Sequence, residues 1–131
     1  MAKPHGRILV GCNESFVTQS LKLVLADSCE VTERASFAEV VHEAITGGFD
    51  VVIVYGNCVS PPRICEGGLL DNTTLAIKTI RASRTVTIVA LTSMAEWCEP
   101  LRAAGADVCF ETPFDLTEFR QTVTSCLQRR V

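Results

Sequence analysis

Cysteine offers the widest choice of chemistry in this sequence, because a thiolate can bind a metal ion, form a disulfide or attack an electrophile. Seven of the 131 residues are cysteines, at positions 12, 29, 58, 65, 98, 109 and 126. Their spacing contains no C-x-x-C pair and no histidine partner, so it does not predict a metal site. Most of them lie in apolar segments, which predicts small buried side chains in a reducing compartment.

Tyr55, which carries a phenol, stands at the end of a continuous apolar run. The four residues before it, 51–54, are all β-branched. A strand without polar alternation must be covered on both faces, which predicts a position in the middle of a parallel sheet. Because ligand chemistry in open α/β sheets collects beyond the carboxyl ends of the strands, we expect the functional residues around Tyr55.

The rest of the sequence alternates between strand and helix patterns. Strands are predicted at 7–11, 30–35, 50–55, 85–91 and 107–110. The second of them is more polar and suits a sheet edge. Each strand is followed by a helix pattern with a candidate N-cap, in turn Ser15, Ser36, Asp71 or Asn72, Ser93 and Asp115. Pro100 lies inside the fourth helix pattern and should make that helix start late or kink.

Five strands alternating with five helices, without a repeat or a linker, predict a single domain over residues 1–131. Such alternation requires right-handed crossovers, so the fold class is α/β with a doubly wound, five-stranded parallel sheet. The formal net charge of −3 argues against nucleic-acid binding, and no apolar run approaches the roughly 18 residues of a membrane span. The N-terminus lacks the apolar segment of a signal peptide, so we expect a cytoplasmic protein.

Three short motifs give the sequence a family resemblance. They are the run 49–54, the pair Thr92-Ser93, and Gly105-Ala106-Asp107 leading to Thr112-Pro113-Phe114. Over its whole length the chain resembles a receiver domain, the phospho-accepting module of bacterial response regulators. The resemblance implies a flavodoxin-like, CheY-like (βα)5 fold with sheet order 2-1-3-4-5.

The family's phosphoryl chemistry depends on five positions, which the resemblance maps onto Cys12, Asn13, Tyr55, Thr92 and Thr112. In the family, two adjacent carboxylates hold Mg²⁺, a third accepts the phosphoryl group, and a hydroxyl and a lysine neutralise its charge. Here the carboxylate pair is replaced by Cys12 and Asn13, the acceptor by Tyr55 and the lysine by Thr112. Thr92 alone keeps the residue type of the family.

This set of residues does not suit Mg²⁺, which needs carboxylate oxygens, and a phenol with a pKa of about 10 is a poor phosphoryl acceptor. We therefore interpret the chain as a degenerate pseudo-receiver that is not an enzyme and uses no cofactor. The resemblance implies a role in two-component or phosphorelay signalling through protein–protein interaction. The expected surface is the face of the fourth helix, fifth strand and fifth helix, which would bind a partner protein or a second copy, not nucleic acid or a membrane.

Three other interpretations stay open. A thiol-based redox sensor would use Cys12, at the end of the first strand, with Cys58 or Cys65 in the loop after the third. A receiver phosphorylated at a non-standard residue would use a hydroxyl such as that of Ser15 or Thr92. A small ligand would bind the altered pocket, with the long segment 56–70 lining it.

Overall fold

The computed structural model describes residues 6–11, 15–25, 29–34, 37–55, 69–83, 86–92, 94–111 and 115–128. These residues form strands β1 (Gly6–Gly11), β2 (Cys29–Arg34), β3 (Val51–Tyr55), β4 (Thr87–Thr92) and β5 (Val108–Glu111). The helices between and after them are α1 (Ser15–Leu25), α2 (Phe37–Thr46), α3 (Leu69–Ser83), α4 (Cys98–Ala104) and α5 (Leu116–Gln128). A 3₁₀ turn, η1 (Ala95–Trp97), comes directly before α4.

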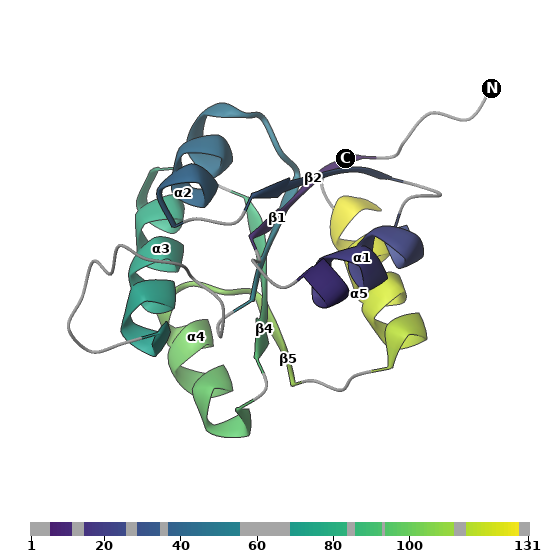
Figure 1. The fold of residues 1–131 in the computed structure, drawn as a ribbon. Helices are drawn as coiled ribbons and strands as arrows, with labels where there is room; N and C mark the ends of the chain where they lie inside the picture. The colour runs from purple at the N-terminus through teal and green to yellow at the C-terminus, as the bar shows by residue number, and fades with distance from the viewer. Residues whose placement is uncertain are drawn as a thin grey trace.

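The five strands are parallel and lie in the order β2-β1-β3-β4-β5, which confirms the predicted fold class and strand order. All five residues of the central strand β3 are buried, which explains why the strand shows no polar alternation. β2 is an edge strand with partly exposed polar side chains, as the sequence predicted. In Figure 1, helices α2, α3 and α4 cover one face of the sheet, and α1 and α5 cover the other.

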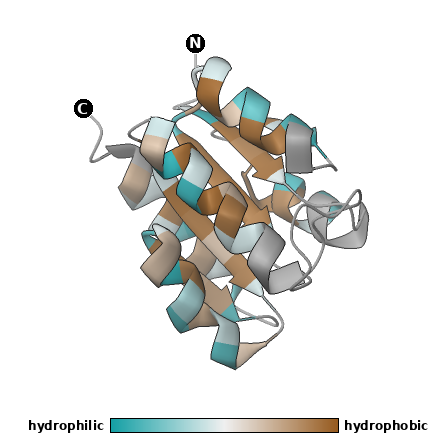
Figure 2. Ribbon diagram, turned by 90° about the vertical axis from the view of Figure 1, so that its left-hand side faces the viewer, coloured by the Kyte–Doolittle hydropathy of each residue, from teal (hydrophilic) through white to brown (hydrophobic). Residues whose placement is uncertain are grey.

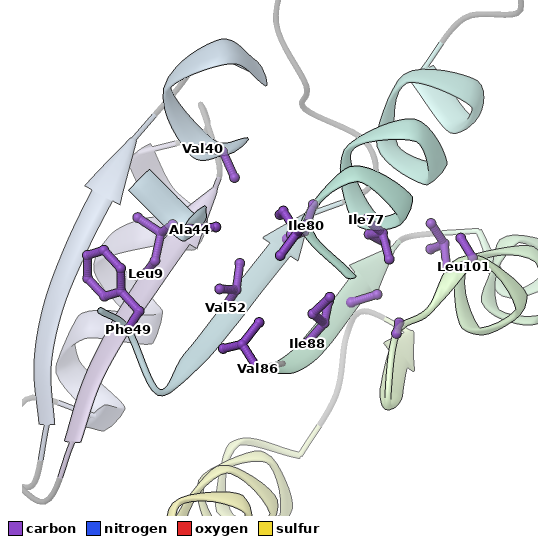
Figure 3. Close-up of a cluster of buried hydrophobic side chains, with 14 residues drawn as sticks. Leu9, Val40, Ala44, Phe49, Val52, Ile77, Ile80, Val86, Ile88 and Leu101 are labelled. Atoms are coloured by element: carbon purple, nitrogen blue, oxygen red, sulfur yellow. The ribbon is translucent and has the colours of Figure 1, made fainter. Parts of the chain in front are cut away.

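Each face of the sheet has its own hydrophobic core, and the side chains of β3 alternate between the two. Val52 and Val54 pack under α2, α3 and α4, in the cluster shown in Figure 3. Val51, Ile53 and Tyr55 pack on the other face, under α1 and α5. Figure 2 shows hydrophobic residues running along the strands, while the helices carry hydrophilic residues as well. None of the helices described is long and apolar enough to cross a membrane.

The start of α5 and the start of α4 agree with the sequence. Asp115 Oδ1 accepts hydrogen bonds from the backbone N–H groups of Thr117 (2.8 Å) and Glu118 (3.3 Å), which confirms Asp115 as an N-cap. The α-helical part of the fourth helix starts late, at Cys98, after η1. Pro100 then falls in the first turn of α4, where its missing N–H would have no partner inside the helix.

The predicted start of α3 is wrong. The helix begins before Asp71 and Asn72, so these residues lie inside its first turn and do not cap it from outside. Short polar side chains are favourable both at the N-cap and in the first turn of a helix. The first turn also has free N–H groups and lies at the positive end of the helix dipole. α1 begins at Ser15 itself. The caps predicted at Ser36 and Ser93 lie outside the described residues.

Two aspartates fix the amino-terminal edge of the sheet in the same way. The Asp50 N–H donates to the carbonyl of Arg7 (2.8 Å), and Asp50 Oδ2 accepts from the N–H of Arg7 (2.9 Å). The Asp107 N–H donates to the carbonyl of Ile88 (2.8 Å), and Asp107 Oδ2 accepts from the N–H of Ile88 (2.8 Å). Each aspartate precedes its strand by one residue and extends the hydrogen-bond ladder to the strand beside it.

An arginine completes each of these two edge contacts. Arg7 donates to the carbonyl of Gly47, just after α2. Arg81 donates to the carbonyl of Gly105, just after α4 (2.8 Å), and to Asp107 Oδ2 (2.7 Å). Gly105 has a φ of 134°, a backbone conformation that favours glycine. The arginines therefore hold the ends of α2 and α4 close to the strands that follow them.

Candidate functional site

The predicted site lies at the carboxyl-terminal edge of the sheet, opposite the edge that the two aspartates fix. Tyr55 ends β3 and Thr92 ends the neighbouring strand β4. These two are the predicted site residues that the structure describes. The other predicted residues lie outside the described part of the chain: Cys12, Asn13, Cys58, Cys65 and Thr112.

Tyr55 has the surroundings of a core residue. Its side chain is 7% exposed and belongs to the hydrophobic cluster under α1 and α5. Its register partner in β4, Leu91, packs in the same cluster, as does Ile53 two residues earlier in β3. The ring therefore fills space between the sheet and these two helices.

Thr92 is fully buried, and its hydroxyl has a local backbone contact. The Thr92 Oγ1 accepts a hydrogen bond from the N–H of Met94 (3.1 Å), which links Met94 to the end of β4. Leu91 packs on the same face of the sheet as Tyr55. Side chains alternate along a strand, so Thr92, the next residue of β4, lies on the opposite face.

The chemistry of the described site does not fit the Mg²⁺ ion that a receiver fold implies. Tyr55 offers a phenol and Thr92 a hydroxyl, whereas Mg²⁺ is bound through carboxylates. Glu111, the register partner of Thr92, is exposed on the edge strand β5. Among the residues described, no group of three His, Cys, Asp or Glu side chains is placed to hold a metal ion. These residues therefore do not supply the ligands that a divalent cation needs.

Two further cysteines behave as the sequence predicted for most of the seven. Cys29 and Cys126 are 5% and 1% exposed and belong to the hydrophobic cluster under α1 and α5. They are small buried side chains of that core. The redox pair predicted from Cys12 with Cys58 or Cys65 lies outside the described residues and stays a prediction.

Cys98 and Cys109 form a thiol pair that the sequence analysis missed. Both are half-buried free cysteines. Burial raises the pKa of Cys109 to about 12, the neighbouring Cys98 raises it further, and the charge of Arg102 lowers it. The pair lies where α4 packs against β5.

Comparison with known proteins identifies the fold of the chain but no sequence family. No protein-family model and no curated protein sequence matches the chain. Among solved structures, it is similar to a two-component response regulator from Clostridium difficile, with a TM-score of 0.77 and 19% identity, over 95% of this chain and 97% of that one. It is also similar to the receiver domain of a sensor histidine kinase from Pseudomonas aeruginosa PAO1, whose active site cleft coordinates a magnesium ion (TM-score 0.77, 20% identity, 94% and 98% covered).

A third similar structure is a CheY-like response regulator receiver domain protein from Methanospirillum hungatei JF-1, with a TM-score of 0.77 and 20% identity, over 94% of each chain. These structural neighbours are response regulators or receiver domains. The chain therefore has the fold of a CheY-like receiver domain, with the strand order that the resemblance implied.

Proposed function

We propose that this chain is a receiver-like signalling module of a two-component or phosphorelay system in the cytoplasm, acting without phosphorylation and without enzymatic activity. The observation that carries the proposal is the burial of Tyr55, which stands at the phospho-acceptor position of the resembled family. Its ring is 7% exposed inside a hydrophobic cluster. A phosphoryl group brings up to two negative charges and three oxygens that need cations or donors. The described members of the cluster around Tyr55, among them Ile53 and Leu91, are apolar and uncharged.

The other positions of the resembled site support the same proposal. Cys12 and Asn13 provide no carboxylate, and Thr112 provides no ammonium group. In phosphoryl transfer, the metal ion and fixed cations offset the charge on the transferred group. A site that lacks these groups together is better explained by lost phosphoryl chemistry than by a single changed residue.

We expect the protein to remain unlabelled when it is incubated with acetyl phosphate and Mg²⁺. The measurement is intact mass, with a phosphorylatable receiver domain as the positive control under the same conditions. A beryllofluoride mimic should likewise leave the amide resonances near Tyr55 unchanged. A stoichiometric mass gain would contradict the proposal. If that gain were lost in Thr92→Ala or in Ser15→Ala, it would establish a receiver with a non-standard acceptor.

We also propose that the module acts through the face formed by α4, β5 and α5, and that this face binds a second copy of the chain. β5 is an edge strand, and its residues Val108, Cys109 and Phe110 are only half-buried. The opposite edge strand, β2, carries charged side chains along its exposed positions. Charges protect an edge strand from pairing with another chain, so β5 is the less protected of the two edges.

Exposed charges of both signs surround this half-buried apolar strip. Arg102 of α4 and Arg120 of α5 are exposed, as are Glu111 at the end of β5 and Glu118 of α5. A two-fold axis places one patch against an identical patch, so a patch that contains both signs can pair each charge with its opposite. This self-complementarity supports a second copy as the occupant.

Charge reversal on this face is expected to weaken self-association about tenfold, which is about 1.4 kcal/mol. The test variant is Arg102→Glu, which changes an exposed residue of α4 near Cys109. The matched control is Lys78→Glu, the same charge change at an exposed position of α3. Sedimentation velocity over a concentration series measures the dimerisation constant. Equal weakening by both variants, or a parent protein that stays monomeric at millimolar concentration, would contradict this assignment of the face.

A further inference from the structure

The two ends of the fourth helix, α4, are held by very different contacts. At its carboxyl end, the Gly105 N–H donates a hydrogen bond to the Arg102 carbonyl (3.0 Å). The Ala106 N–H donates to the Leu101 carbonyl (3.2 Å), and these two bonds together form a Schellman motif. Leu101 and Ala106 are also buried in one hydrophobic cluster, where Figure 3 labels Leu101. The last turn of α4 is therefore fixed both by backbone hydrogen bonds and by burial.

The Arg81 side chain of α3 anchors the same end of α4. Its Nε and Nη2 atoms donate to the Gly105 carbonyl (3.2 and 2.8 Å). Nη1 donates to the Val86 carbonyl (2.8 Å), just before β4, and Nη2 also donates to Asp107 Oδ2 (2.7 Å), just before β5. One side chain thus connects the end of α4 to α3 and to the residues that lead into two strands.

The amino end of α4 lacks comparable contacts within the part of the chain that the structure describes. Neither Met94, before η1, nor Trp97, before α4, makes a side-chain capping hydrogen bond. No residue of η1 is buried, and Met94 is 39% exposed. This end is connected to the sheet by the hydrogen bond from the Met94 N–H to Thr92 Oγ1 (3.1 Å). It is also connected by Trp97, which packs at the rim of the cluster under α2, α3 and α4.

Pro100 weakens the junction between η1 and α4. In a continuous helix, the N–H of residue 100 would donate to the carbonyl of Glu96, four positions earlier, but proline has no N–H. Inside η1, the Trp97 N–H donates to the Met94 carbonyl (2.9 Å) in a 3₁₀ hydrogen bond. Such bonds have poorer geometry than those of an α-helix. The segment before Pro100 is therefore the weakly held part of this helix.

We propose that residues 94–98, called the strap here, open locally from the sheet while residues 101–106 stay in place. In the closed state, Trp97 packs at the rim of the core and the Met94 N–H is bonded to Thr92. In the open state these two contacts are lost, and solvent reaches Trp97 and the rim of the cluster. The Schellman motif and the hydrogen bonds of Arg81 are kept, so the hinge lies between Cys98 and Leu101.

This device is a property of a single chain and is independent of the function proposed above. α4 contributes to the face proposed for self-association, so a strap that opens changes the apolar surface of that face. Opening itself needs no partner, and it is measured at a protein concentration at which sedimentation shows only monomer. A strap that fails to open therefore leaves the proposed function standing, and a protein that fails to self-associate leaves the strap standing.

Amide hydrogen exchange followed by NMR measures the opening residue by residue, because a protected amide exchanges only when its hydrogen bond opens. After correction for intrinsic rates, we expect the amides of Met94 and Trp97 to exchange at least about 100-fold faster than those of Gly105 and Ala106. Low urea concentrations should leave the Trp97 rate almost unchanged, since a local opening exposes little surface.

A capping side chain should hold the strap closed. Met94 is the N-cap of η1, and its extended backbone (φ −114°, ψ 109°) suits a residue that caps a helix. Met94→Asp should therefore slow exchange at Trp97 about fivefold and leave Gly105 unchanged. The matched control, Met94→Leu, keeps an apolar side chain without an acceptor and should change neither rate. Trp97→Ala removes the apolar contact at the rim and should raise exchange at Met94 about tenfold.

Equal protection and equal urea dependence of Trp97 and Gly105 would overturn the proposal, because α4 would then open as one body. It is also overturned if Gly105 is the less protected of the two, or if Met94→Asp fails to slow exchange at Trp97. A Trp97 amide that exchanges at its intrinsic rate would show that the closed strap does not form.

Discussion

Replacing Tyr55 by aspartate is expected to lower the free energy of unfolding by about 3–5 kcal/mol and to leave the protein unlabelled by acetyl phosphate. The ring is 7% exposed and packs with Leu91 and other core side chains under α1 and α5. Truncating it leaves a cavity, and the described members of its cluster, which are apolar, would solvate the new carboxylate poorly. The substitution restores the acceptor of the resembled family but neither the carboxylate pair nor the lysine.

Urea unfolding of Tyr55→Asp beside the parent measures the loss, with and without Mg²⁺. The matched control is Tyr55→Phe, which keeps the ring and removes only the hydroxyl, so its expected cost is about 1 kcal/mol or less. A variant as stable as the parent would contradict the core role of Tyr55. Recovery of stability on adding Mg²⁺, or phosphorylation of the variant, would show that this edge of the sheet retains a cation site.

The central part of the fold could be predicted because one strand leaves little choice. Residues 51–54 carry β-branched side chains on both faces, and such a strand is stable only between two covering layers. The alternation of strands and helices then required parallel crossovers, and the resemblance added the strand order. The start of α3 could not be predicted in the same way. Asp71 and Asn72 are favourable both as caps and in a first turn, so local chemistry does not distinguish the two.

The site was only partly predictable from the sequence. The strand pattern predicts that Tyr55 and Thr92 stand at strand ends, the resemblance implies that these strands are neighbours, and the structure places them there. The burial of Tyr55 depends on which helices cover its face, and that is set by the path of the whole chain rather than by nearby residues. The Tyr55 side chain lies on the same face of the sheet as those of Val51 and Ile53, because every second side chain of a strand points to the same face.

The thiol pair depends on a tertiary contact between α4 and β5, so neither cysteine identifies it alone. The spacing of cysteines along the sequence does not show this, because a separation of ten intervening residues matches no common metal or redox motif.

The second large effect is expected at Asp107, where alanine should lower the free energy of unfolding by about 2–3 kcal/mol. Asp107 Oδ2 accepts both the N–H of Ile88 (2.8 Å) and the guanidinium of Arg81 (2.7 Å). The contact with Ile88 is partly buried, so its loss leaves a backbone donor without an acceptor, and this accounts for most of the cost. The ion pair with Arg81 adds less, because its two side chains are 32% and 47% exposed.

Three matched variants separate these contributions in urea unfolding. Asp107→Asn keeps a carbonyl oxygen for the Ile88 N–H and loses only the charge, so we expect a cost of about 1 kcal/mol. Asp50→Ala removes the equivalent hydrogen bond from the Arg7 N–H, and this bond is exposed. Water can therefore replace the lost acceptor, so the expected cost is about half that of Asp107→Ala. Glu30→Ala breaks an ion pair whose side chains are 46% and 59% exposed, and should change stability by less than about 0.5 kcal/mol. If Asp107→Asn costs as much as Asp107→Ala, the ion pair with Arg81 is the main contribution and the buried backbone donor is the minor one.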